Sequence, residues 1–148
     1  MTKLFAQATI IFLIGTLPAV ASDRFITKLK LPSDQTVVIS EGEFEARSIG
    51  SFSVRLYQAA SAEDETTFFT DGLIGARDGY IERVVLSDIN GNKQPEIIVI
   101  VRSAGTGSYL SAHAFTIGKS EKLALYSIVE GLQSEADPVA ALKQSKSK

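Results

Sequence analysis

The sequence predicts an all-β domain, either an antiparallel β-sandwich or a barrel-like single domain, with one short C-terminal helix. Runs rich in β-branched and aromatic residues recur along the chain. Turn-forming residues separate these runs at short intervals. The run Phe52–Gln58 also alternates apolar with polar side chains, as a strand does when one of its faces meets water. Such a pattern favours two packed sheets or one closed sheet.

Nine segments fit the strand pattern, and turn-forming residues bound each of them. The predicted strands are Phe25–Leu31, Thr36–Ser40, Phe44–Ser48, Phe52–Gln58, Thr66–Thr70, Tyr80–Ile89, Glu96–Ser103, Tyr109–Ile117 and Leu123–Val129. The predicted turns are Pro32-Ser33-Asp34, Ser40-Glu41-Gly42-Glu43, Ile49-Gly50-Ser51, Asp71-Gly72, Arg77-Asp78-Gly79, Asn90-Gly91-Asn92 and Ile117-Gly118-Lys119.

Two elements carry a more specific prediction. The run Ile97–Val101 is apolar at every position, which suits a central strand that is covered on both sides. Near the C-terminus, Asp137 can cap a helix and Pro138 can take its first position. We therefore expect a short helix over Val139–Lys143.

The first 21 residues have the pattern of a secretory signal peptide. Lys3 gives a positive start, residues 4–17 are mostly apolar, and Ala19-Val20-Ala21 is a small-residue cleavage site. A membrane anchor is the alternative, but a full span needs about 20 apolar residues, and this run is shorter. We therefore expect cleavage after Ala21, which leaves residues 22–148 as a single exported domain without a membrane anchor.

Composition excludes several classes of protein. The chain has no cysteine, so it can form no disulfide and lacks the acceptor residue of a lipoprotein. It holds 15 Lys and Arg against 17 Asp and Glu, and loss of Lys3 with the signal peptide would make the balance more acidic. Because phosphate binding needs clustered positive charge, nucleic acid is not an expected partner.

The sequence offers weak support for catalysis. His113 is the only histidine, and it lies within a predicted strand without a nucleophile motif nearby. We interpret it as a partly exposed strand residue. Glu41, Glu43 and Glu45 alternate and should form one solvated side of a hairpin. A carboxylate pair for glycoside hydrolysis stays open, since it depends on a three-dimensional separation.

The segment Asp88–Glu96 places oxygen ligands at alternating positions, as calcium loops do. An EF-hand loop needs glycine at its sixth position and glutamate at its twelfth, whereas Gly91 is fourth here and Val99 is twelfth. The pattern favours a turn in which the Asp88 side chain accepts bonds from nearby backbone N–H groups. We expect neither a metal nor a cofactor.

The candidate binding site is the segment Ser103-Ala104-Gly105-Thr106-Gly107-Ser108-Tyr109, which places four hydroxyl groups and two glycines between two predicted strands. Gly105 and Gly107 permit backbone conformations that other residues resist. A phosphate cradle is poorly supported, because neither a helix nor a P-loop lysine follows. A plain hairpin turn is the alternative, but such a turn requires neither Tyr109 nor so many hydroxyl groups.

With this segment, the chain resembles the periplasmic inhibitors of invertebrate-type (i-type) lysozymes. The resemblance covers most of residues 22–148 in order. It rests on Glu41-Gly42, Arg47–Tyr57, Asp78-Gly79-Tyr80-Ile81, Asp88–Asn92, Pro95-Glu96-Ile97 and Arg102–Ala112. Related inhibitors of c-type lysozymes carry a similar loop, often with cysteines, and one branch has a lipid anchor; neither feature occurs here.

The resemblance implies an all-β periplasmic protein that is a homodimer, has no enzymatic activity and inserts segment 103–109 into the lysozyme cleft. The family pattern has a serine three residues before the tyrosine, and Thr106 takes that place here. Thr106 and Tyr109 would offer O–H donors to the lysozyme carboxyl groups, with Ser103 or Ser108 as further candidates. Two other classes stay open, namely an exported glycan-binding or calcium-stabilised β-module and a hydrolase.

Overall fold

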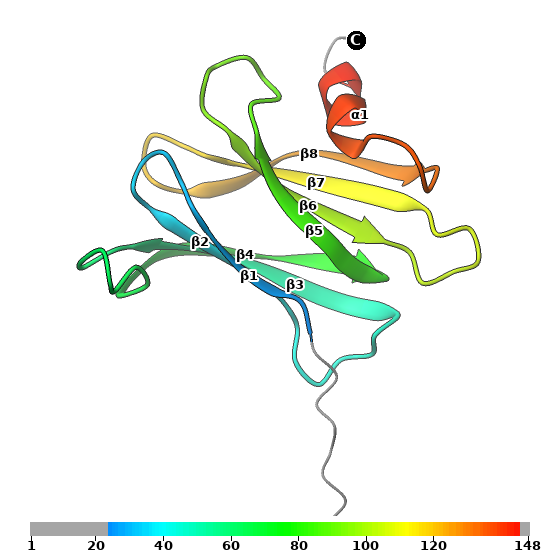
Figure 1. The fold of residues 1–148 in the computed structure, drawn as a ribbon, viewed down its shortest axis with the longest axis horizontal. Helices are drawn as coiled ribbons and strands as arrows, with labels where there is room; N and C mark the ends of the chain where they lie inside the picture. The colour runs from blue at the N-terminus through cyan, green and yellow to red at the C-terminus, as the bar shows by residue number, and fades with distance from the viewer. Residues whose placement is uncertain (1–23, 146–148) are drawn as a thin grey trace, which may run out of the picture.

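A computed structural model describes residues 24–145, and the predicted signal peptide lies outside this range. Eight strands form two four-stranded antiparallel sheets that pack face to face, with one helix on the outer side of the second sheet (Figure 1). The all-β prediction is therefore confirmed as an open sandwich. Within residues 24–145, no helix is both long enough and apolar enough to cross a membrane.

Each sheet follows chain order, so every pair of neighbouring strands is joined by one turn or loop. The first sheet contains β1 (Ile26–Lys30), β2 (Thr36–Glu41), β3 (Ile49–Gln58) and β4 (Phe68–Asp78). The second sheet contains β5 (Tyr80–Ser87), β6 (Glu96–Arg102), β7 (Leu110–Ile117) and β8 (Leu123–Leu132), and helix α1 (Pro138–Ser145) follows it.

The main core lies between the sheets. Its largest members on β3 are Phe52, Val54 and Leu56, which are fully buried and confirm the predicted alternation of that strand. The core contains Leu31, Val37, Ile39, Phe52, Val54, Leu56, Ile81, Ile97, Val99, Val101, Phe115 and Leu123. Burial of each large apolar side chain contributes about 1.5–3 kcal/mol to folding.

A second core lies between the outer side of the second sheet and α1. Ile98 and Ile100 of β6 pack there in the same cluster as Leu142 of the helix. Because the alternate residues of β6 face the first sheet, this strand is covered on both sides, as predicted. The helix start is also confirmed, since the Asp137 carboxylate accepts N–H bonds from Val139 at 2.9 Å and Ala140 at 3.2 Å.

Two of the predicted strands differ from the structure, one in its existence and one in its boundaries. The segment Phe44–Ser48 forms no strand, because carbonyls of this segment accept bonds from arginine side chains rather than from a neighbouring strand. The predicted strand Thr66–Thr70 is part of β4, which begins at Phe68 and continues through the predicted turn Asp71-Gly72 to Asp78. The predicted turn Ile49-Gly50-Ser51 is also wrong, because β3 begins at Ile49. Gly75 of β4 leaves room for the Phe52 ring, whose Cζ would lie 2.5 Å from an added Cβ.

A tight corner at Gly79 carries the chain from the first sheet to the second. Its φ of +115° is a backbone conformation that favours glycine. A Cβ at this position would lie 1.9 Å from the carbonyl oxygen of Arg102, so no other residue fits. The Gly79 N–H donates to the Ser48 carbonyl at 2.8 Å. The corner therefore joins the β2–β3 loop to the end of β6.

His113 lies on the side of β7 that faces the first sheet, where its ring meets Phe52 edge-on at a centroid distance of 5.4 Å. Burial lowers the pKa of His113 below its usual 6.5, and the charge of Glu130 opposes this shift. The partly exposed position agrees with the predicted structural role, and no catalytic partner is needed to explain it.

The His113 environment predicts that stability declines as the medium becomes acidic. The unfolded chain takes up this proton first, so stability should be complete above about pH 6.5 and should fall as pH drops towards the lower folded pKa. Denaturant unfolding at about pH 7.5 and about pH 5.5 measures the difference. The His113→Gln variant should lose less stability over this interval, and equal losses in the two proteins would contradict the assignment.

Candidate partner-binding loop

The segment 103–109 joins β6 to β7 at the end of the sandwich that also holds the Gly79 corner (Figure 1). The Ser103 N–H closes its base by donating to the Tyr109 carbonyl at 2.9 Å. The Ser108 N–H donates to the Gly105 carbonyl at 3.1 Å, which places residues 106 and 107 at the tip of a turn. The segment is thus a closed hairpin loop whose tip is exposed, as the sequence predicted.

The hydroxyl groups of the loop are not equivalent. The Ser103 hydroxyl already accepts the N–H of Gly105 at 3.1 Å, and Ser108 is half-buried. Thr106 is exposed at the tip, and Tyr109 keeps 46% of its surface accessible. Thr106 and Tyr109 are therefore the hydroxyl groups best placed to meet a partner.

The glycines of the loop act by leaving space. A Cβ at Gly107 would lie 2.2 Å from Cε2 of Tyr109, so the tyrosine ring packs directly against the glycine backbone. The left-handed backbone of this loop occurs at Ser108, with φ of +46°, and not at a glycine. Neither Gly105 nor Gly107 has a positive φ, so the loop does not use the conformational freedom that these glycines permit in that way. At Gly107, the close packing of the Tyr109 ring requires the small residue instead.

Arg102 braces the loop from below. Its Nη1 donates to the Ser108 carbonyl at 3.0 Å, while its Nε forms an ion pair with Glu82. The hydrogen bond and the charge of Glu82 raise the pKa of Arg102, so the guanidinium stays charged. Sequence reasoning missed this role. The only sequence signal for this role is an arginine directly before the loop. The role also depends on Glu82, which comes close to Arg102 only through the pairing of Tyr80 with Arg102.

The neighbouring β2–β3 loop is organised by Arg77, whose side chain is fully buried. Its guanidinium donates to the carbonyls of Ser51 at 3.0 Å, Arg47 at 2.9 Å and Ala46 at 3.0 Å. It also donates to the Gly79 carbonyl, which lies in the corner between the sheets. One buried charge therefore fixes this loop and the corner together.

Glu45 completes this network. Its carboxylate accepts the Ser51 N–H at 2.6 Å and the Ser51 hydroxyl at 2.7 Å, and it lies 3.5 Å from the Arg77 guanidinium. These bonds from Ser51, followed by the positive charge of Arg77, lower the pKa of Glu45. The carboxylate is therefore ionised at neutral pH and holds the loop closed.

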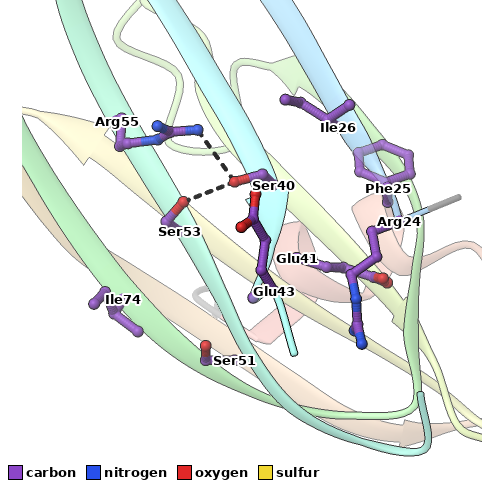
Figure 2. Close-up of a pocket in the computed structure, with 11 residues that line it drawn as sticks. Arg24, Phe25, Ile26, Ser40, Glu41, Glu43, Ser51, Ser53, Arg55 and Ile74 are labelled. Carbon is purple, nitrogen blue, oxygen red and sulfur yellow. Dashed lines mark hydrogen bonds between the residues drawn. The ribbon is translucent and has the colours of Figure 1, made fainter. Parts of the chain in front are cut away.

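The three glutamates at 41, 43 and 45 do not share one solvated face, so that expectation is wrong. Glu41 is buried and accepts the Ile81 N–H at 2.8 Å, which ties the two sheets together. Glu43 is exposed. Glu41 and Glu43 border a groove of about 510 Å³ on the first sheet, together with Arg24 and Arg55 (Figure 2). The side chains alternate between the two faces of the sheet only within β2, which ends at Glu41. Glu43 and Glu45 belong to the β2–β3 loop and do not follow that alternation.

The segment Asp88–Glu96 forms the predicted turn. The Asp88 carboxylate accepts N–H bonds from Gly91 at 2.7 Å and Lys93 at 2.8 Å. Burial would raise the pKa of Asp88, but the backbone N–H bonds outweigh it and lower the pKa. Glu96 is buried below and accepts the Ile89 N–H at 2.9 Å. Among residues 24–145, no group of three or more histidine, aspartate or glutamate side chains could hold a metal ion.

Comparisons with known proteins agree with this architecture. The family model described as "Periplasmic lysozyme inhibitor of I-type lysozyme" matches residues 23–146. The crystal structure of PliI-Ah from Aeromonas hydrophila shares 49% identity, with a TM-score of 0.75 over 80% of this chain and 98% of that chain. The crystal structure of Aeromonas hydrophila PliI in complex with Meretrix lusoria lysozyme shares 47% identity. Its TM-score is 0.76 over 84% of this chain and 99% of that chain.

No protein in the curated set matches the chain. The family model spans all of the described residues, and each of the two structures shares almost half of its aligned residues with this chain. The resemblance that was based on the loop and its flanking motifs is confirmed. The chain belongs to the family of periplasmic lysozyme inhibitors of I-type lysozyme.

Proposed function

We propose that this protein inhibits I-type lysozyme by inserting loop 103–109 into the active-site cleft of the enzyme. The observation that carries the proposal is the braced loop, which presents Thr106 and Tyr109 while its base is closed by backbone bonds. Family membership supports the target class. A protein similar to this chain has been crystallised in complex with a lysozyme, which supports a direct protein partner.

The chemistry of the target explains why hydroxyl groups suit this task. Lysozymes cleave glycans with two carboxyl groups that face a groove shaped for a sugar chain. The O–H groups of Thr106 and Tyr109 would donate to these carboxyl groups, and a hydrogen bond to a charged group contributes about 1.5–3 kcal/mol. Inhibition is then occlusion of the cleft, in which this chain performs no chemical step.

The loop is prepared for binding before it meets the enzyme. The Tyr109 ring rests on Gly107, and Arg102 holds the Ser108 carbonyl from below. Ordering a mobile side chain on association costs about 0.5–1.5 kcal/mol. Because these contacts already order the loop in the free protein, less conformational entropy is lost on binding. A preorganised aromatic side chain also supplies contact area, as hot-spot residues do.

One prediction of this proposed function concerns the loop hydroxyl groups. Thr106→Ala and Tyr109→Ala should each raise the inhibition constant for an I-type lysozyme by about tenfold or more, since each loses a bond to a charged group. A lysis assay with purified residues 22–148 measures the constant, and c-type and g-type lysozymes test selectivity. Thr66→Ala is the matched control, because Thr66 is exposed between β3 and β4. Undiminished inhibition by both loop variants would place the site elsewhere.

Another prediction of the proposed function concerns Arg102 as a positioning residue. Arg102→Ala should weaken inhibition although Thr106 and Tyr109 remain, because the Ser108 carbonyl loses its support. Arg102→Lys should recover little, since an ammonium group cannot imitate the planar fork that joins Glu82 to that carbonyl.

The control for Arg102 is Arg83→Ala, because Arg83 also pairs with Glu82. The Arg83 variant should inhibit normally if the loop depends on the Arg102 bond to Ser108. Thermal unfolding of both variants separates loss of positioning from loss of fold. Equal inhibition by the Arg83 and Arg102 variants would argue against a positioning role.

We also propose that the exported form begins at Ser22 and is a homodimer. The Ala19-Val20-Ala21 site supports the first point. The outer face of the first sheet supports the second, since Ile26 and Ile74 stand exposed on either side of the groove (Figure 2). The periplasmic protein should have the intact mass of residues 22–148, and sedimentation should give twice that mass. A longer chain would refute the cleavage, and a monomer would refute the dimer.

A further inference from the structure

The β2–β3 loop presents a fully exposed phenylalanine. Phe44 is 100% exposed, whereas the next most exposed large apolar side chain among residues 24–145 is Ile74 at 79%. Phe44 also has a φ of +59°, a conformation that disfavours residues other than glycine and asparagine. The folded chain alone gains nothing from a strained and exposed aromatic residue, so a function outside the fold is indicated.

The loop that carries Phe44 is held in one shape. Four consecutive carbonyls, those of residues 45–48, accept hydrogen bonds from other parts of the chain. Arg24 donates to the first, Arg77 donates to the second and third, and the Gly79 N–H donates to the fourth. A side chain at the tip of such a loop is presented with little backbone freedom left to lose, which favours binding.

The β2–β3 loop also lies near loop 103–109. Gly79 donates its N–H to the Ser48 carbonyl, and its α-carbon packs against the Arg102 carbonyl. One residue therefore separates the end of the β2–β3 loop from the residue that precedes loop 103–109. Figure 1 shows the same relation, since β3 begins and β6 ends on one side of the sandwich.

A protein that binds loop 103–109 must contact more of the surface than that loop. A stable protein interface buries about 800 Å² on each partner, from about 20 to 30 residues, and the loop has only seven. The remaining contact area has to come from the same end of the sandwich. The exposed apolar side chains near the Gly79 corner include Phe44, Ile49 and Tyr80, and Phe44 is the most exposed of them.

We propose that Phe44 is a second anchor for the lysozyme that binds loop 103–109, and that it packs against an apolar surface outside the catalytic cleft. This inference rests on the proposed function. The partner is a protein rather than an anionic membrane surface, because exposed Glu43 precedes Phe44 and the Glu45 carboxylate follows it. An aromatic ring on a rigid loop is the type of residue that acts as a hot spot.

The test uses Phe44→Gly in the full chain, with binding to a purified I-type lysozyme measured by calorimetry and inhibition measured by lysis. Glycine adopts a φ of +59° without strain, so the variant should stay folded. The dissociation and inhibition constants should rise by about tenfold. Phe68→Ala is the matched control, because Phe68 is also an exposed phenylalanine, with 58% of its surface accessible. It lies at the start of β4, whereas the Gly79 corner follows the opposite end of that strand. The control variant should leave both constants unchanged.

The outcomes separate this inference from the proposed function. If Tyr109→Ala weakens inhibition and Phe44→Gly does not, the loop mechanism stands and the second anchor is overturned. If neither variant weakens inhibition, both proposals are overturned. If Phe44→Gly converts a dimer to a monomer in sedimentation while inhibition is unchanged, the side chain serves an interface between copies, and the second anchor is again overturned.

Discussion

The hydrogen bonds of the buried Arg77 guanidinium are the interactions on which the candidate binding end of this protein depends. A charge removed from water is costly, and loss of its partners typically destabilises a protein by about 3–5 kcal/mol. Here four backbone carbonyls and the Glu45 carboxylate surround the group. These acceptors belong to the β2–β3 loop, to the start of β3 and to the corner at Gly79. The arginine thus makes one structural unit of three segments that would otherwise be independent turns.

This unit supports loop 103–109 through short and direct contacts. The corner residue Gly79 packs against the backbone of Arg102, and the side chain of Arg102 holds the Ser108 carbonyl. Strand β6, which ends at Arg102, is buried by the first sheet on one side and by α1 on the other. A loop that grows from a strand packed on both faces has a rigid base, and a rigid base limits the entropy lost on binding.

Local patterns made much of the fold predictable from sequence. The alternation in β3, the continuous apolar run of β6 and the Asp137-Pro138 helix start each depend on residues close together in the chain, and all three predictions were confirmed. The exposed loop was likewise visible from its glycines and hydroxyl groups. Local patterns could not reveal a strand boundary that depends on hydrogen bonds to a residue far away in the sequence. The β2–β3 loop replaces a predicted strand because Arg77, about thirty residues later, takes its carbonyls.

The same limit applied to the site. Tyr109 needs Gly107 for space, which sequence reasoning interpreted as backbone freedom, and Arg102 gains its role only through the pairing of β5 with β6. The tip residue Thr106 illustrates a consequence of this division of labour. It lies outside both cores, and the bonds that close the loop base are made by other residues. A substitution at this position should therefore change the surface that the loop presents at little cost to folding, so the tip can vary while the scaffold stays the same.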